Sequence, residues 1–244
     1  MRKYSKVAAL IVCILSSAHF ALQAQTYRVE AGYAQPRIYS SEISHRFFHE
    51  FRLGGTAEFD FPQVGFLSFQ TGLSYSYLFG NNSQRFRLPN VLDSLRINTQ
   101  GHQLNIPVYA VASYTIVRVI RVSAFAGPNF NIGLAMPQRV ETNIVVDDTP
   151  TGMRNLRQIE GFGYRLGNSD LYDGRLRRFN LQMDVGASAQ WWKIQVRGGY
   201  SFGLNNISNW DIRFYDPISE DNIFTVHPQR QRQSGWFVSL AYEF

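Results

Sequence analysis

Ten charged residues fall at alternate positions in stretches that otherwise have the composition of β-strands. They are Arg28, Glu30, Glu50, Arg52, Glu58, Asp60, Arg121, Asp184, Arg197 and Glu243. Acidic and basic groups along the inside of a closed sheet could conduct ions or protons. They could also pair with one another and fill the interior. We expect the second arrangement, because the inside of a small closed sheet is only wide enough for side chains to fill.

Histidine is the other residue type that could carry chemistry here. His45 and His49 have a four-residue spacing that would bring them together on a helix to bind a metal. The sequence places them in a loop that leads into a strand, where this spacing does not do so. His102 and His227 have no evident partner. We therefore expect no metal site and no cofactor.

An enzyme built on such a closed sheet would need a nucleophile or an acid–base set on its wall or rim, usually built around histidine. Serine and aspartate are plentiful, but no arrangement centred on histidine stands out. The sequence therefore favours a protein that is not an enzyme, and a surface enzyme acting on lipid or peptide is the less favoured alternative.

Two long segments alternate strictly between apolar and polar residues, which is typical of a β-strand with different environments on its two faces. Residues 67–79 place Leu67, Phe69, Thr71, Leu73, Tyr75, Tyr77 and Phe79 on one face and mainly Ser, Gln and Gly on the other. Residues 179–191 repeat the split. These segments are longer than the usual strand of a soluble protein, but their length matches that of a tilted membrane strand of ~9–11 residues. Aromatic residues also gather near the ends of the apolar faces, as in interfacial girdles.

We count eight such strands, at about 27–34, 49–61, 66–79, 99–113, 119–134, 178–191, 194–205 and 232–244. Short connections alternate with long ones, the longest at about 135–177, which is the pattern of outer-membrane barrels. The sequence predicts an all-β fold, an eight-stranded antiparallel transmembrane β-barrel with long extracellular loops, short periplasmic turns and both termini periplasmic. Because Pro107 and Pro128 fall inside strands of a sheet without edges, we expect local bulges there.

The N-terminal 24 residues resemble a secretory signal peptide. Arg2, Lys3 and Lys6 precede an apolar run at 7–15, and small residues lead to Ala24. We therefore expect residues 1–24 to be removed and 25–244 to form the barrel. Cys13, the only cysteine, would be lost with the signal. The remainder would carry a net charge of +3, which is too small to favour binding of nucleic acid.

The C-terminal strand carries a second recognisable signal. Its outward-facing residues are Trp236, Val238, Leu240, Tyr242 and Phe244, and the chain stops on the aromatic residue. This pattern resembles the assembly signal that barrel-assembly machinery recognises in outer-membrane proteins.

Three segments resemble strands of the PorT-like outer-membrane β-barrel family. Residues 104–109 (LNIPVY) match its L-x-I-P strand, 125–128 (FAGP) its Gly-Pro strand and 200–207 (YSFGLNNI) its Y-x-x-G-L-x-N-I strand end. Asp184, Val185 and Gly186 also fit. The resemblance covers most of the chain outside the long loops. It implies an accessory or structural role in type IX protein secretion across the outer membrane.

Arginines recur in the predicted loops and could bind lipopolysaccharide phosphates or a partner. They are Arg85, Arg87, Arg154, Arg157, Arg165, Arg230 and Arg232, and Asp147, Asp148, Asp170 and Asp173 could instead neutralise them. We expect contacts with outer-membrane lipid and lipopolysaccharide, barrel-assembly machinery and other secretion proteins. A small channel or a general structural barrel is the alternative function.

Overall fold

The computed structural model describes residues 26–39, 46–61, 63–88, 91–117, 119–146, 149–160, 172–173, 177–207, 212–215, 222–226 and 231–244. The expected signal peptide lies outside these ranges, as do Cys13, His45, His227, Arg165 and Arg230. Within the described ranges, no helix is long and apolar enough to cross a membrane.

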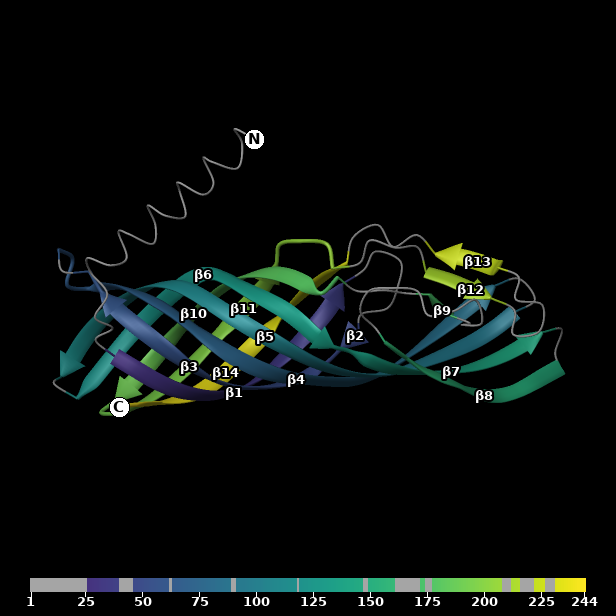
Figure 1. Ribbon diagram of the computed structural model, residues 1–244, viewed down its shortest axis with the longest axis horizontal. Helices are drawn as coiled ribbons and strands as arrows, with labels where there is room; N and C mark the ends of the chain where they lie inside the picture. The colour runs from purple at the N-terminus through teal and green to yellow at the C-terminus, as the bar shows by residue number, and fades with distance from the viewer. Residues whose placement is uncertain are drawn as a thin grey trace, which may run out of the picture.

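Eight antiparallel strands form a closed barrel (Figure 1). They are β1 (Thr26–Tyr39), β3 (His49–Asp60), β4 (Leu67–Leu88), β5 (Val91–Val117), β6 (Ile120–Ala135), β10 (Phe179–Trp191), β11 (Ile194–Gly203) and β14 (Arg232–Glu243). Each strand pairs with its two neighbours in this order, and β1 pairs with β14 to close the ring. The predicted eight-stranded fold is confirmed.

The barrel is polar inside and apolar outside. Asp184 and Gln70 are 0% and 1% exposed, whereas Leu53 and Leu240 are 60% and 56% exposed. The alternation of the sequence produces this reversal, because successive side chains of a strand point to opposite faces. A wall of exposed apolar side chains is suited to contact with lipid rather than water.

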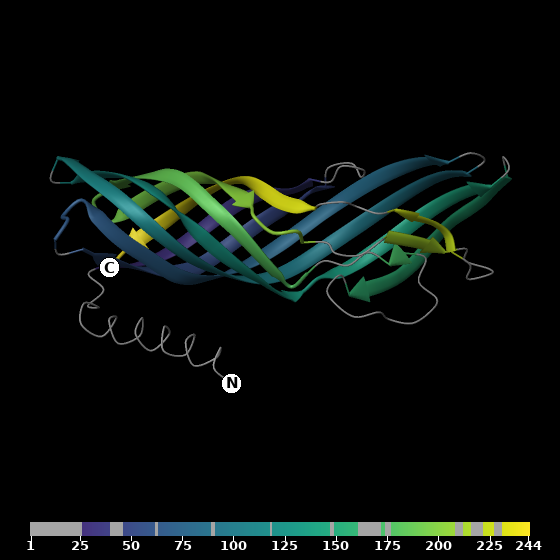
Figure 2. The same ribbon diagram turned by 90° about the horizontal axis from the view of Figure 1, so that it is seen from above.

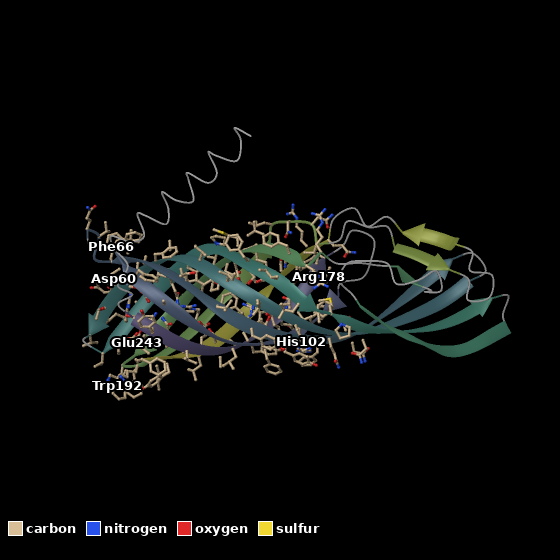
Figure 3. All side chains as sticks on the ribbon, in the orientation of Figure 1. Asp60, Phe66, His102, Arg178, Trp192 and Glu243 are labelled. Carbon is tan, nitrogen blue, oxygen red and sulfur yellow. The ribbon has the colours of Figure 1, made fainter. Side chains whose placement is uncertain are left out.

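The two ends of the barrel differ in their connections. We call one the turn end, because β3–β4, β5–β6 and β10–β11 are joined there by the short segments 61–66, 118–119 and 192–193. Trp192 adopts a φ of 55°, the left-handed region that tight turns require. Figure 3 shows Asp60, Phe66, Trp192 and Glu243 at this end, with His102 and Arg178 towards the other, which we call the loop end.

Much of what the sequence predicts as loop is strand. The hairpin of β4 and β5 continues past the barrel to the pair Leu88↔Val91. The predicted loop at 135–177 contains β7 (Pro137–Val146), which pairs with β5, and β8 (Thr149–Glu160), which pairs with β7. Figure 2 shows these strands extending away from the barrel. The long connections that the sequence predicts therefore contain paired strands in these segments.

Four short strands complete the sheets. β2 (Arg46–Phe47) pairs with β1, while β9 (Tyr172–Asp173), β12 (Ile212–Tyr215) and β13 (Asn222–Val226) form a separate three-stranded sheet.

The two prolines do not produce the bulges that the sequence predicts. The pairs Pro107↔Asn129 and Ala110↔Ala126 keep one register across β5 and β6, although the ladder is interrupted between them. Pro128 lies opposite Val108, next to the pair Pro107↔Asn129, so only one of the two prolines can have its missing donor in the ladder between β5 and β6. The hydroxyl of Thr71 donates a 2.9 Å hydrogen bond to the carbonyl of Pro107, which offers that oxygen a partner from β4. The shifts between β5 and β6 lie elsewhere, at His102/Gln103 and Thr115/Val117.

Candidate functional site

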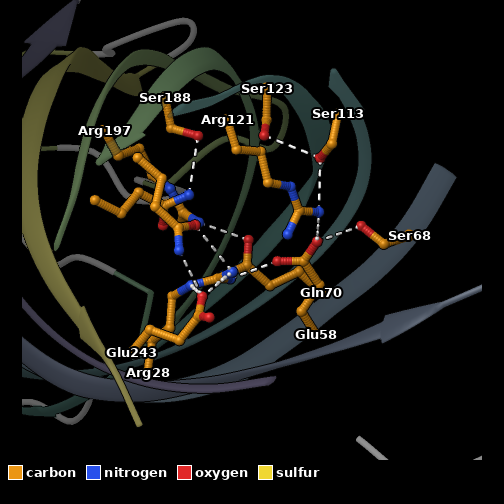
Figure 4. Close-up of polar contacts among 12 residues, drawn as sticks. Arg28, Glu58, Ser68, Gln70, Ser113, Arg121, Ser123, Ser188, Arg197 and Glu243 are labelled. Carbon is orange, nitrogen blue, oxygen red and sulfur yellow. Dashed lines mark hydrogen bonds and ion pairs between the residues drawn. The ribbon is translucent and has the colours of Figure 1, made fainter. Parts of the chain in front are cut away.

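The interior near the turn end is occupied by a network of ion pairs (Figure 4). The guanidinium of Arg28 pairs with Glu58 and, at 2.9 Å, with Glu243. Glu58 also accepts bonds from Arg121 at 2.5 Å and from the Ser68 hydroxyl at 2.6 Å. The network joins β1, β3, β4, β6 and β14, so it crosses the lumen rather than lining it.

A second set of polar contacts lies next to this network. Arg197 donates to Gln70 at 2.6 Å and to Glu30 at 3.3 Å. Its guanidinium also lies 4.8 Å from the ring centre of Phe125, which projects inward from β6. Because Arg197 is 4% exposed, its charge is held by these groups and not by bulk water.

The middle of the lumen contains one further ion pair and a buried carboxylate. Arg52 pairs with Glu50 at 2.8 Å. Asp184 accepts hydrogen bonds from the Tyr109 hydroxyl at 2.6 Å and from the Asn129 amide at 2.9 Å. The contacts of Asp184 join β10 to its neighbour β6 and to β5 beyond it, whereas the Arg52–Glu50 pair lies within β3.

The structure thus places nine of the ten predicted lumen charges within the barrel, and brings eight of them into ion pairs. Asp184 is the ninth and is held by neutral donors. The tenth, Asp60, is exposed at the turn end. Four arginines face five carboxylates, which leaves the interior nearly neutral. The sequence did not single out Gln70, Tyr109 or Gln190, which donates to Glu243 at 2.8 Å, because neutral polar residues are common on every inward face.

The loop end of the lumen is closed by apolar side chains, which we call the apolar seal. Its members are buried and come from five different segments: Ile38, Phe48, Leu78, Met136 and Ile207. The backbone N–H of Phe48 donates to the carbonyl of Pro36 at 2.9 Å, and this bond holds the segment between β2 and β3 against the opening. One signal for the seal is in the sequence, since the inward face of β4 changes from Ser76 to Leu78.

Between the ion-pair network and the apolar seal, the packing leaves a cavity of about 40 Å³. Glu30, Arg52, Asn105 and Asn129 are among its lining residues. A buried water needs roughly 10–15 Å³, so this space holds a few water molecules rather than a continuous pore. Several buried polar atoms that lack a protein partner, such as Asn105 Oδ1 and Thr56 Oγ1, belong to lining residues and are suited to bind such waters.

The outer wall carries a belt of rings near the loop end, which we call the aromatic band. It consists of Trp236, Tyr33, His49, Phe51, Phe79, Tyr77, His102 and Tyr75, with neighbouring ring centres 5.3–6.0 Å apart. Both histidines of the described ranges lie in this band. Each shares a hydrogen bond with a tyrosine hydroxyl through Nδ1: His49 with Tyr33, and His102 with Tyr75. No cluster of potential metal ligands occurs among the described residues.

The C-terminal strand presents its predicted assembly residues on the outer wall. Trp236, Val238, Leu240, Tyr242 and Phe244 are 41–73% exposed. The last of them lies at the turn end, where its backbone N–H donates to Tyr27 at 3.1 Å. The backbone of the last residue is therefore hydrogen-bonded, while the side chain of Phe244 stays exposed.

Three of the segments that resemble PorT-like proteins, 104–109, 125–128 and 184–186, lie on β5, β6 and β10, which are consecutive strands of the barrel, and 200–207 begins on β11, the strand after β10. A methyl group added at Gly127 would lie 2.1 Å from the carbonyl oxygen of Val108, and one at Gly186 would lie 2.3 Å from that of Gly198. Only glycine allows such close approach of backbones. Packing of the barrel therefore accounts for the motif residues on β5, β6 and β10. Gly127 and Gly186 allow neighbouring backbones to approach, and Tyr109 donates a hydrogen bond to Asp184.

A closed ring of eight strands, polar inside and apolar outside, defines an integral outer-membrane β-barrel. The chain belongs to the outer membrane protein beta-barrel domain family, which matches residues 18–209. It is therefore a protein of the outer membrane.

Among solved structures, the chain is similar to Neisserial surface protein A, with 10% identity, a TM-score of 0.37, and coverage of 89% of this chain and 97% of that one. It is also similar to Ail, the attachment invasion locus protein of Yersinia pestis, with 10% identity, a TM-score of 0.30, and coverage of 90% and 98%. A comparison with curated proteins found no match.

Proposed function

We propose that this protein is a non-conducting, non-enzymatic outer-membrane barrel that acts as an accessory component of type IX protein secretion. The observation that carries the proposal is the closed lumen, blocked by ion pairs at the turn end and by the apolar seal at the loop end. A barrel that cannot transmit solute acts through its outer surfaces. The strands that project beyond the barrel offer one such surface.

The secretion role rests on resemblance to PorT, the family member that this sequence resembles most. The matching residues are those of 104–109, 125–128 and 200–207. We also propose that the loop end faces the outside and both termini face the periplasm, since outer-membrane barrels have short periplasmic turns and longer external connections. The two described histidines bond to tyrosines on the lipid-facing wall, which supports a role other than acid–base catalysis.

Single-channel recording tests the closed lumen. The purified full chain in planar bilayers is expected to give no steady conductance. A reproducible open level would overturn the proposal and favour the alternative of a small channel, for which the polar interior is the main argument.

A deletion strain tests the secretion role. Loss of the protein is expected to reduce release of secreted cargo, and normal release would contradict the role. A shortened chain then locates the contact: because Gln138 and Ile159 are directly paired, residues 139–158 can be replaced by Asn-Gly, a two-residue turn. This variant is expected to enter the outer membrane normally but not to restore secretion.

Thiol labelling tests the orientation. Asn81→Cys lies at the loop end and Gly65→Cys at the turn end, where nothing lies within 4 Å of an added side chain. A membrane-impermeant reagent added to whole cells is expected to label the first variant alone. Labelling of Gly65→Cys alone would reverse the orientation.

A further inference from the structure

The loop end carries a cationic patch on the outer wall, just beyond the aromatic band. It is built from β1, β2, β11 and β14, and we call it the arginine patch. Its members are Arg37, Tyr39, Phe47, Tyr200 and Arg232. The guanidinium of Arg37 lies 4.4 Å from the ring centre of Phe47. Tyr39 and Tyr200 are hydrogen-bonded through their side chains and lie near Arg37.

The register places the two arginines side by side on one face. Tyr39 is directly opposite Arg232, and Arg37 is opposite Ser234, so Arg37 and Arg232 are diagonal neighbours about 7–8 Å apart at their Cα atoms. Both arginine side chains point outward, because Ile38 and Gln233, the residues that follow them in their strands, are buried and successive side chains alternate. Within the described side chains, no carboxylate pairs with either arginine. Two positive charges are thus directed towards the surroundings of the barrel.

The outward face of β14 continues from this patch towards the turn end. After Arg232 and Ser234 come Trp236, Val238 and Leu240, of which the last three are exposed apolar or aromatic side chains. Four residues of a strand tilted by about 40° separate Arg232 from Trp236, a rise of roughly 10 Å along the membrane normal. Since aromatic girdles mark the membrane interface, this distance beyond Trp236 is the one expected of groups at the depth of lipid headgroups.

We propose that the arginine patch binds a phosphate group of the phosphorylated glycolipid in the outer leaflet, with its acyl chains along Val238 and Leu240. Arginine forks match phosphate geometry, and stacking on Phe47 orients one fork in advance. The continuous face from cation to aromatic ring to apolar wall matches the order of groups in such a lipid. The choice of the outer leaflet rests on the proposed orientation of the barrel.

Binding to the refolded full chain in neutral detergent tests the proposal, because both ends of the barrel are then accessible. Native mass spectrometry would count bound lipid A carrying two phosphates, dephosphorylated lipid A, and phosphatidylglycerol. We expect Arg37→Gln and Arg232→Gln each to weaken binding of phosphorylated lipid A about tenfold. The unchanged chain is expected to bind dephosphorylated lipid A and phosphatidylglycerol weakly. Its binding of these two lipids should be as weak as the binding of phosphorylated lipid A by the double variant, which carries both Arg37→Gln and Arg232→Gln.

Lys193→Gln is the matched control, since it removes one positive charge from the opposite rim, where Lys193 lies 5.8 Å from the ring centre of Tyr242. Its binding is expected to equal that of the unchanged chain. Equal losses in Lys193→Gln, or unchanged binding in the double variant, would overturn the proposal, and so would tighter binding of phosphatidylglycerol.

If the double glutamine variant does not refold, Arg37→Lys with Arg232→Lys keeps the charge and removes the fork. Intermediate binding of lipid A is then expected, and full binding would contradict recognition by the fork. A failure of either kind leaves the secretion role and the orientation intact, because those are tested by the deletion strain and by thiol labelling.

Discussion

The hydroxyl of Tyr109 donates a 2.6 Å hydrogen bond to Oδ2 of Asp184, a residue 75 positions further along the chain. The bond joins β5 to β10 over the inner face of β6, the strand between them, and Asn129 of β6 adds a second donor at 2.9 Å. Asp184 is 0% exposed, so water does not replace these partners if they are removed. The carboxylate depends on its neutral donors for its hydrogen bonds.

Tyr109→Phe is expected to lower the free energy of unfolding by ~1–3 kcal/mol, because it removes one donor from a buried carboxylate. Urea unfolding of the protein in lipid vesicles, followed by tryptophan fluorescence, measures the change. Tyr114→Phe is the control on the same strand, since Tyr114 is 71% exposed. Its cost is expected to stay within ~0.5 kcal/mol. Equal costs at the two positions would contradict a role for the Asp184 bond.

Glu58→Gln is expected to cost ~3–5 kcal/mol in the same unfolding measurement, because Arg28 and Arg121 lose their shared buried partner. Asp60→Asn changes the next carboxylate of the same phase, which is exposed, and is expected to change stability by less than ~0.5 kcal/mol. A Glu58 variant as stable as the Asp60 variant would show that the network does not stabilise the barrel.

Leu78→Ala is expected to cost ~2–5 kcal/mol, since it opens a cavity in the apolar seal. Leu73→Ala on the same strand faces outward and is 54% exposed. Lipid fills the space left there, so its cost is expected to stay below ~1 kcal/mol. The difference between their urea midpoints measures the packing of the seal, and equal midpoints would mean that the seal is loosely packed.

Gly127→Ala is expected to destabilise the barrel by about 3 kcal/mol or more, because the added methyl group would overlap the Val108 carbonyl. Gly55→Ala is the matched control, since its nearest neighbour would be 3.6 Å away. Heat-modifiable migration on a gel distinguishes folded from unfolded protein in both variants. A Gly127 variant that folds as readily as the Gly55 variant would refute the argument from close approach.

Phe244→Ala is expected to reduce the amount of protein in the outer-membrane fraction strongly while leaving the urea midpoint of refolded protein almost unchanged. Phe244 is 73% exposed, so its loss removes little packing, and recognition by assembly machinery would account for the defect. Trp191→Ala removes an aromatic residue that is 68% exposed at the same end. If both variants reach the membrane equally poorly, the terminal position has no special role.

The strand count could be read from the sequence because membrane strands alternate cleanly. The period-2 pattern at 67–79 and 179–191 reflects lipid on one side of the strand and a polar lumen on the other. The difference in polarity between the two faces is strong in both segments. The ends of the strands could not be read in this way. Beyond the barrel, β4 and β5 pair without a lipid face, so residues such as Arg85 and Arg87 carry no apolar alternation. The β-branched run Ile144, Val145 and Val146 was a usable signal for β7.

The interior could be predicted only in part. Charged residues on the inward phase were conspicuous, yet their pairing depends on which strands face each other across the ring. Phe48, Met136 and Ile207 lie outside the barrel strands, so no periodicity places them in the seal. Pro107 and Pro128 misled the prediction because their compensation depends on the register of β5 against β6.

The ladder between β4 and β5 runs from Leu88↔Val91 at its tip to Leu67↔Ala112 at the turn end of the barrel. The tip lies at least eight residues beyond Gly80, which corresponds to roughly 30 Å of strand. The register is the same at the tip and at the turn end, so one alignment of β4 and β5 sets the pairing both outside and inside the barrel. A slip of one residue at the tip would therefore also have to be accommodated within the barrel wall, where it would exchange the side chains that face the lumen with those that face lipid.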